Sequence, residues 1–211
     1  MSSKKESRNL IITGVGGQGN VLSSQLVGQA LVRKGYFVTI GETYGASQRG
    51  GSVMSHIRIS PQKQLSPLIP KGKADVVVAL EPVEGLRILT VYGNPETVAI
   101  ANTRPIYPVD VTSGQEKYPE REEIEKALAS LARKVYSVPA TEKAIQMGSP
   151  ILSNMIMIGA LLELNLLPLR AEEFRETLVD HFDEKRLKVN LRALEEGRKA
   201  VQAKQSREIG R

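Results

Sequence analysis

The sequence has 211 residues, a length that fits one domain, or one domain with a C-terminal extension. Hydrophobic residues make up 41% of the chain, which is enough for a buried core and argues against global disorder. There is no run of eighteen apolar residues, and the polar N-terminus lacks an apolar signal segment. We therefore expect no membrane contact and a cytoplasmic protein.

The chain contains no cysteine and only two histidines, His56 and His181. A disulfide, a thiol nucleophile and a Cys-ligated iron–sulfur cluster are therefore excluded, and two isolated histidines predict no metal site. The net charge of +6 would allow nucleic-acid binding, but much of the excess lies near the termini. Because no arginine-rich helix with interleaved aromatic residues occurs, we interpret the charge as a solvated surface and expect no nucleic-acid partner.

The N-terminal part of the sequence predicts strands and one helix. The pattern indicates a strand over 9–13, a helix over 20–34 that Gly35 stops, and a strand over 36–40. A polar loop follows over 41–51. Residues 52–59 alternate with period two, which favours a half-covered or edge strand.

Further strands and helices alternate through the rest of the chain. We expect strands at 74–80, 97–101 and 135–140, one extended piece near 106–111, and helices at 83–89, 121–132, 140–147, 150–165, 171–180 and 184–202. This alternation predicts an α/β protein, a three-layer α/β/α sandwich. Scarce aromatic residues favour a core of Val, Ile, Leu and Ala, as in parallel sheets buried on both faces. We expect one domain over 1–202 and a frayed tail over 203–211.

A glycine-rich segment follows the first predicted strand and opens the first predicted helix. Its residues are Gly14, Gly16, Gly17, Gln18 and Gly19. Gly14 would allow a sharp turn, the next two glycines would let the backbone approach an anion, and Gly19 would permit close helix–strand contact. The N–H groups of the helix would then face the ligand. A merely tight structural turn is the alternative. Glu42, at the end of the second predicted strand, stands where a dinucleotide-binding site needs an acid. A long loop follows it instead of another βαβ unit, so an autonomous dehydrogenase is disfavoured.

A second glycine-rich loop lies about thirty residues later. Its candidate binding residues are Tyr44, Gln48, Arg49, Gly50 and Gly51. A guanidinium can hold a phosphate or carboxylate through two hydrogen bonds, and paired glycines allow close approach. A surface turn with a solvated arginine is the alternative. Both loops follow strands, at the edge where open α/β sheets bind ligands, which favours one shared site.

Other polar residues have a structural explanation beside a functional one. A packed histidine is the more common reading of His56 than a general base. Glu81, after a buried strand, fits either a helix cap or the ligand edge. Arg104 fits either an anion contact or a solvated loop residue. The apolar helix 151–164 is typical of a core or a subunit interface, which we favour over a cofactor-binding segment, and Gly159 and Ala160 would allow close helix approach.

Six segments then identify a resemblance that spans most of the chain. They are GVGGQG at 14–19, YGASQRGGSVMSHIRIS at 44–60, SPLIP at 66–70, ADVVVALEPVEGLR at 74–87, NTRPIYPV at 102–109 and GALLELNLLP at 159–168. In this order they resemble the gamma-type subunit or domain of 2-oxoacid:ferredoxin oxidoreductases, above all the small (beta) subunits that act on indolepyruvate.

The resemblance implies a mostly parallel sheet, like domain III of pyruvate-ferredoxin oxidoreductase, with a helical C-terminal extension. It also implies oxidative decarboxylation of an arylpyruvate with coenzyme A (CoA) to an acyl-CoA, carbon dioxide and reduced ferredoxin. The large (alpha) subunit would hold thiamine diphosphate and the iron–sulfur clusters, so this chain would hold no cofactor alone and would work in a hetero-oligomer. We assign no catalytic side chain here, because the thiamine ylid carries the carbanion chemistry.

The resemblance leaves alternatives for the substrate and the class of protein. Tyr44 also suits gamma subunits that act on other 2-oxoacids, such as pyruvate, 2-oxoglutarate or branched-chain oxoacids. A stand-alone nucleotide-binding module is the rival reading of the first glycine-rich segment, and a basic nucleic-acid binder is a third. In the oxidoreductase reading, 14–19 and 44–51 line a cleft shared with the large subunit and hold a phosphate of CoA or thiamine diphosphate.

Overall fold

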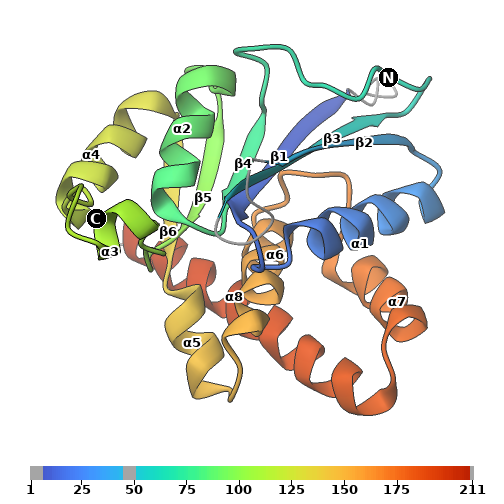
Figure 1. Ribbon diagram of the computed structural model, residues 1–211. Helices are drawn as coiled ribbons and strands as arrows, with labels where there is room; N and C mark the ends of the chain where they lie inside the picture. Colours follow the sequence, from blue (N-terminus) through green and yellow to red (C-terminus); the bar gives the residue numbers. More distant parts are fainter. Residues whose placement is uncertain (1–6, 45–50, 210–211) are drawn as a thin grey trace.

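The computed structural model describes residues 7–44 and 51–209, and a six-stranded sheet runs through its middle (Figure 1). The strands lie in the order β2-β3-β1-β4-β5-β6. Their bounds are β1 Arg8–Val15, β2 Phe37–Tyr44, β3 Ser52–Ser60, β4 Val76–Ala79, β5 Val98–Asn102 and β6 Lys134–Val138. All strands except β3 run in one direction, so the expected mostly parallel sheet is confirmed.

Strand β3 departs from the expectation of a half-covered or edge strand. It lies between β2 and β1 and pairs antiparallel with both. The period-two pattern suggested one solvent-facing side because it contains polar residues. Two of them, Ser55 and His56, are instead fully buried under the helices of the two faces. The true edge next to it is β2, which extends to Tyr44 and so shortens the loop predicted over 41–51.

Helices cover both faces of the sheet. Their bounds are α1 Asn20–Arg33, α2 Pro82–Tyr92, α3 Val109–Thr112, α4 Arg121–Leu131, α5 Ala140–Gln146, the 3₁₀ helix η1 Pro150–Leu152, α6 Ser153–Glu163, α7 Ala171–His181 and α8 Glu184–Ile209. One hydrophobic cluster joins one face of the sheet to α1 and α5–α8, and a second joins the other face to α2 and α4. The three-layer sandwich is therefore confirmed.

Two local expectations were wrong. The extended piece near 106–111 contains the short helix α3, because the carbonyl of Pro108 accepts hydrogen bonds from the backbone N–H groups of Val111 and Thr112. Proline suits such a first turn, since its ring presets the helical φ and it has no N–H to leave unpaired. The last helix was expected to end at 202, whereas α8 continues to Ile209. The division of the chain into a domain over 1–202 and a tail stays a prediction.

Helix α6 belongs to the core of this chain. Every residue from Ser153 to Leu162 is buried, and α8 crosses α6 with direct backbone contact. A Cβ atom on Gly159 would lie 2.0 Å from the carbonyl oxygen of Leu194, and one on Gly197 would lie 1.8 Å from that of Ile156. The close approach predicted at Gly159 is confirmed, and the core reading of this helix replaces the subunit-interface reading.

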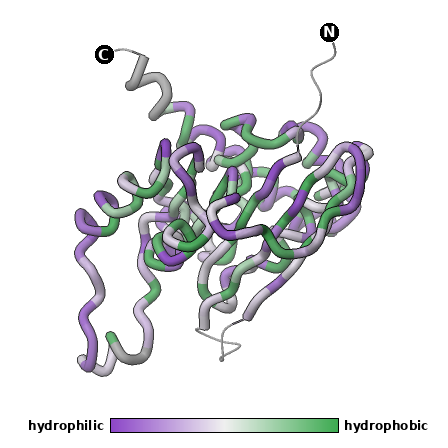
Figure 2. The backbone as a smooth tube through the Cα atoms, turned by 90° about the horizontal axis from the view of Figure 1, so that it is seen from above, coloured by the Kyte–Doolittle hydropathy of each residue, from purple (hydrophilic) through white to green (hydrophobic). Residues whose placement is uncertain are grey.

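Hydrophobic segments gather in the middle of the molecule, and hydrophilic residues dominate the outer helices and loops (Figure 2). Within the described ranges, no helix combines the length and apolar character that a membrane span requires.

Candidate functional site

The glycine turn of residues 14–19 lies where β1 ends beside β4. Gly17 and Gly19 have φ angles of 101° and 84°, in the left-handed region that glycine adopts without strain. Gly14 instead lies within β1, so it does not make the sharp turn that we expected. A Cβ atom there would lie 2.4 Å from Oε1 of Gln18 and 3.0 Å from Cβ of Leu80. Because Gly14 has no side chain, the turn can fold back against β4.

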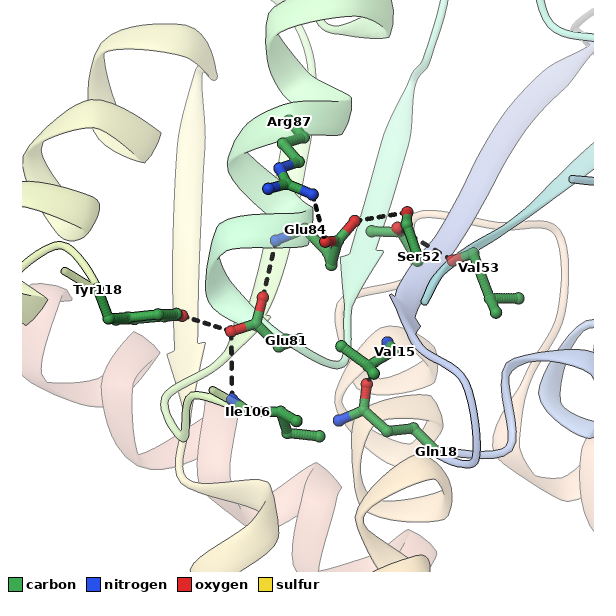
Figure 3. Close-up of polar contacts among 10 residues, drawn as sticks. Val15, Gln18, Ser52, Val53, Glu81, Glu84, Arg87, Ile106 and Tyr118 are labelled. Atoms are coloured by element: carbon green, nitrogen blue, oxygen red, sulfur yellow. Dashed lines mark hydrogen bonds and ion pairs between the residues drawn. The ribbon is translucent and has the colours of Figure 1, made fainter. Parts of the chain in front are cut away.

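Gln18 fastens this turn to the ends of β1 and β4, and Figure 3 shows it beside Val15. Its Oε1 accepts a hydrogen bond from the backbone N–H of Val15 at 2.7 Å, and its Nε2 donates to the carbonyl of Leu80 at 2.9 Å. The side chain therefore holds the turn in place. A direct contact of Gln18 with a cofactor stays a prediction.

The structure brings the two glycine-rich segments together. The backbone N–H of Gly16 donates to the carbonyl of Gly51 at 2.9 Å, and Tyr44 lines a pocket with Gly16, Gly17 and Gly19. Of the remaining candidates in the second loop, Gln48, Arg49 and Gly50 lie outside the described residues. The two segments meet because β3 runs antiparallel to β1 and therefore begins where β1 ends.

The N-terminus of α1 offers hydrogen-bond donors to this pocket. Its N-cap residue, Gly19, has no side chain that could accept from the first turn. In the part of the chain that the structure describes, the backbone N–H groups of Asn20, Val21 and Leu22 have no acceptor, and all three residues line the pocket. Unpaired N–H groups and the positive end of the helix dipole together favour an anion.

Tyr44 and Glu42 interact at the rim of the same pocket. The Tyr44 hydroxyl donates to the Glu42 carboxylate, and this hydrogen bond raises the pKa of Tyr44. The Ser24 hydroxyl of α1 lies 3.3 Å from the other carboxylate oxygen, but its shorter hydrogen bond, at 2.8 Å, goes to the carbonyl of Val21. The Tyr44 hydroxyl thus occupies one oxygen of the carboxylate that a dehydrogenase would use to bind a ribose.

Asn20 is a buried polar residue beside the turn that the sequence reasoning missed. Its Nδ2 donates to the carbonyl of Val53 at 3.3 Å, which ties α1 to β3, while its buried Oδ1 has no partner among the described residues. Thr13 reaches the same carbonyl at 3.2 Å. The signal available in the sequence was a polar residue at the first position of an otherwise apolar helix face.

Glu81 caps α2 and also holds the segment that follows β5 (Figure 3). Its Oε2 accepts from the backbone N–H of Glu84 at 2.8 Å, and its Oε1 accepts from the Tyr118 hydroxyl and from the backbone N–H of Ile106 at 3.4 Å. Burial raises the pKa of Glu81, and burial together with the hydrogen bond to Glu81 raises the pKa of Tyr118. The cap reading of Glu81 is therefore confirmed.

His56 lies away from the turn, in the interior of the protein. Its Nδ1 accepts a hydrogen bond from the backbone N–H of Ile69 at 3.3 Å, and its ring packs edge-on against Tyr92 with 5.1 Å between ring centres. Burial lowers the pKa of His56, which keeps the ring neutral. The packed reading of His56 accounts for this environment.

Within the described ranges, no cluster of three or more His, Asp or Glu side chains is arranged to hold a metal ion.

Arg104, which the sequence left between an anion contact and a solvated residue, lines a second pocket beside Gly16–Gln18. Gly16 and Gly17 thus line two pockets, one with Tyr44 and one with Arg104.

Comparison with known proteins gives relatives over nearly the whole chain. The chain is 40% identical over 189 residues to indolepyruvate oxidoreductase subunit IorB of Archaeoglobus fulgidus, covering 90% of this chain and 92% of that protein. It is 38% identical over 194 residues to the subunit of the same name from Thermococcus kodakarensis, with 92% and 95% covered.

A solved structure shares the fold. The 2-oxoglutarate:ferredoxin oxidoreductase from Magnetococcus marinus, with 2-oxoglutarate, coenzyme A and succinyl-CoA bound, matches with a TM-score of 0.72 at 24% identity. The match covers 95% of this chain and 32% of that one. The family described as pyruvate ferredoxin/flavodoxin oxidoreductase matches residues 9–200, and this chain belongs to it.

Proposed function

We propose that this chain is the small subunit of an oxidoreductase that converts an arylpyruvate, such as indolepyruvate, and CoA to an acyl-CoA and carbon dioxide while reducing ferredoxin. The observation that carries the proposal is the 40% identity to an indolepyruvate oxidoreductase subunit over 90% of this chain and 92% of that protein. The glycine turn and its unpaired N–H groups supply the matching physical feature, a place for an anion at the sheet edge.

In this proposal a larger subunit holds thiamine diphosphate and the iron–sulfur clusters, and the working protein is a hetero-oligomer. A chain without cysteine cannot ligate such clusters through thiolates, which fits this division. When bound, thiamine diphosphate supplies the carbanion chemistry. The residues of this chain bind and orient: the N–H groups at the start of α1, with Arg49 from the second loop, hold a phosphate of CoA or of thiamine diphosphate.

The geometry fits a phosphate for two reasons. Gly16 and Gly17 carry no side chain that would keep an anion from the backbone, and the N–H groups of Asn20, Val21 and Leu22 have no acceptor within the described chain. Preorganised donors of this kind stabilise charge without reorganising when the ligand arrives. We also propose that the protein acts in the cytoplasm.

The test is co-expression with a candidate large subunit, followed by a ferredoxin-reduction assay with indolepyruvate, phenylpyruvate, pyruvate, 2-oxoglutarate and a branched-chain oxoacid in turn. We expect the arylpyruvates to give the highest kcat/KM, and omission of CoA to abolish acyl-CoA formation. Faster turnover of a non-aromatic oxoacid would contradict the substrate assignment. Failure of the two chains to co-purify, with tight nucleotide binding by this chain alone, would favour a stand-alone module instead.

A further inference from the structure

A further pocket lies between α4 and the segment that joins β5 to α4, at the carboxyl ends of β5 and β6. It has a volume of about 290 Å³, close to the lower end of the range of small-molecule sites. Within the described chain, no residue of the glycine turn lines this α4 pocket, so it is separate from the two pockets beside that turn. Its lining combines an apolar floor, two tyrosine rings and a charged rim.

The floor of the α4 pocket is apolar. It contains Ala101 of β5 and Ile124 and Leu128 of α4, which are all buried. Pro82, at the start of α2, adds another apolar surface. A hydrocarbon or ring that enters the pocket would leave water for this surface, which is favourable, whereas a group that is charged throughout would lose its hydration there. The floor therefore favours a ligand with an apolar part.

Tyr107 and Tyr118 form an aromatic wall beside this floor. Their rings pack edge-on, with 5.1 Å between the ring centres and 87° between the planes. The Tyr118 hydroxyl donates to buried Glu81, and the same carboxylate oxygen accepts from the backbone N–H of Ile106 at 3.4 Å (Figure 3). One carboxylate thus fixes both tyrosines in place. The Tyr107 ring remains 55% exposed, so it can pack against an aromatic ligand.

The rim of the pocket carries both signs of charge. Its charged residues are Glu120, Arg121 and Glu125, at the start of α4. Arg121 donates through Nε to the Glu125 carboxylate at 2.8 Å, and within the described residues its guanidinium forms no other ion pair. The terminal guanidinium nitrogens can therefore bind a carboxylate, while the two glutamates can accept from an ammonium group. Such a rim complements a zwitterion better than a simple anion or cation.

We propose that the α4 pocket binds a free aromatic amino acid. The ring packs against Tyr107 above the apolar floor, the carboxylate of the ligand pairs with Arg121, and its ammonium group pairs with the rim glutamates. An aromatic amino acid carries an ammonium group where an arylpyruvate carries a ketone, so the glutamates favour the amino acid over the oxoacid. The inference goes beyond the proposed function and holds whichever reaction the protein catalyses.

The test is isothermal titration of the full-length chain with L-tryptophan, for which we expect saturable binding. Three probes each lack one part of the ligand. L-Leucine keeps both charges without the ring, N-acetyl-L-tryptophanamide keeps the ring without the charges, and indolepyruvate lacks the ammonium group. We expect each of them to bind at least tenfold more weakly than L-tryptophan, because each leaves one part of the pocket unused.

Two pairs of variants then locate the site. Arg121→Gln should weaken L-tryptophan binding about tenfold, whereas Arg186→Gln, which removes another exposed and ion-paired arginine from α8, should change the Kd less than twofold. Tyr107→Ala should weaken binding about fivefold, and Tyr107→Phe, which keeps the ring, less than twofold. Thermal melts of each variant check the fold.

The inference is overturned if L-tryptophan does not bind saturably, or if any of the three probes binds as tightly as L-tryptophan. It is also overturned if Arg121→Gln and Arg186→Gln weaken binding equally, since the ligand would then lie elsewhere. The titrations need neither a partner subunit nor turnover. Their failure would therefore leave the proposed function intact, and failure of the turnover assay would not affect them.

Discussion

The glycine turn after β1 and the crossing of α6 with α8 both depend on glycine, for opposite reasons. In the turn, Gly17 and Gly19 adopt positive φ angles, and the backbone N–H groups at the start of α1 have no acceptor within the described residues. In the crossing, Gly159 and Gly197 lie in regular helices, and their missing side chains let two backbones touch. The first region keeps the hydrogen-bonding capacity that the proposed function assigns to a ligand, whereas the second uses close packing to stabilise the fold.

The largest effect is expected at the helix crossing. Gly197→Ala places a methyl group where the carbonyl oxygen of Ile156 would lie 1.8 Å away, and rigid backbone cannot yield cheaply. We expect a loss of unfolding free energy of about 3 kcal/mol, at the upper end of overpacking costs. Chemical denaturation measures it.

Gly28→Ala is the matched control for this substitution. Gly28 is also within a helix, but the atom nearest to its added methyl group is Cδ1 of Ile40, the mobile end of a side chain, at 2.8 Å. Alanine also gains up to about 1 kcal/mol of helix propensity, so the net change should be small. Equal destabilisation by both substitutions would show that the crossing has no special constraint.

The next effect concerns the turn and tests function rather than stability. In the complex with a large subunit, Gly16→Val combined with Arg49→Ala should lower kcat/KM by about a hundredfold, because a branched side chain would enter the pocket and a phosphate partner would be lost. Arg33→Ala, at the far end of α1, removes the same charge and should leave turnover within twofold. Normal turnover by the double variant would remove the assignment of the turn to the active site.

A smaller effect is expected at the contact between Tyr118 and Glu81. Tyr118→Phe removes the hydroxyl that donates to the buried carboxylate and should lower stability by about 1 to 2 kcal/mol. Tyr107→Phe is the control, since the Tyr107 ring packs edge-on against Tyr118 but its side chain is 55% exposed. Stability is measured by urea denaturation at pH 7, where equal values for the two variants would contradict the role of the hydroxyl.

The smallest effect is a pH dependence caused by His56. Burial lowers its pKa in the folded protein below the value of about 6.5 that it has when unfolded. Between these two values the unfolded chain binds more protons, so stability rises with pH and is lost as pH falls below about 6.5.

The slope caused by one histidine is at most about 1.4 kcal/mol per pH unit. His56→Gln should flatten the curve of unfolding free energy between pH 5 and about 6.5, whereas His181→Gln, which removes the other, exposed histidine, should keep the dependence caused by His56. An unchanged slope in His56→Gln would contradict the assignment.

Much of the fold could be predicted from local pattern. The apolar run before the glycine turn, the buried strand β4 and the helix over 20–34 each carry a periodicity that directly reflects burial. The glycine spacing placed a backbone turn at the end of the first strand. The position of strand β3 inside the sheet was harder to predict, because burial of Ser55 and His56 depends on helices contributed by distant parts of the chain.

What the sequence determined by itself is therefore the order of elements, the layer architecture and the location of the glycine turn, since these follow from short-range periodicity and backbone freedom. Only the tertiary structure decided that Gly14 packs rather than turns, that Arg104 and Ser153 share a pocket, and that α6 is core. Those results depend on segments far apart in the sequence meeting through packing and buried hydrogen bonds, which no local pattern encodes.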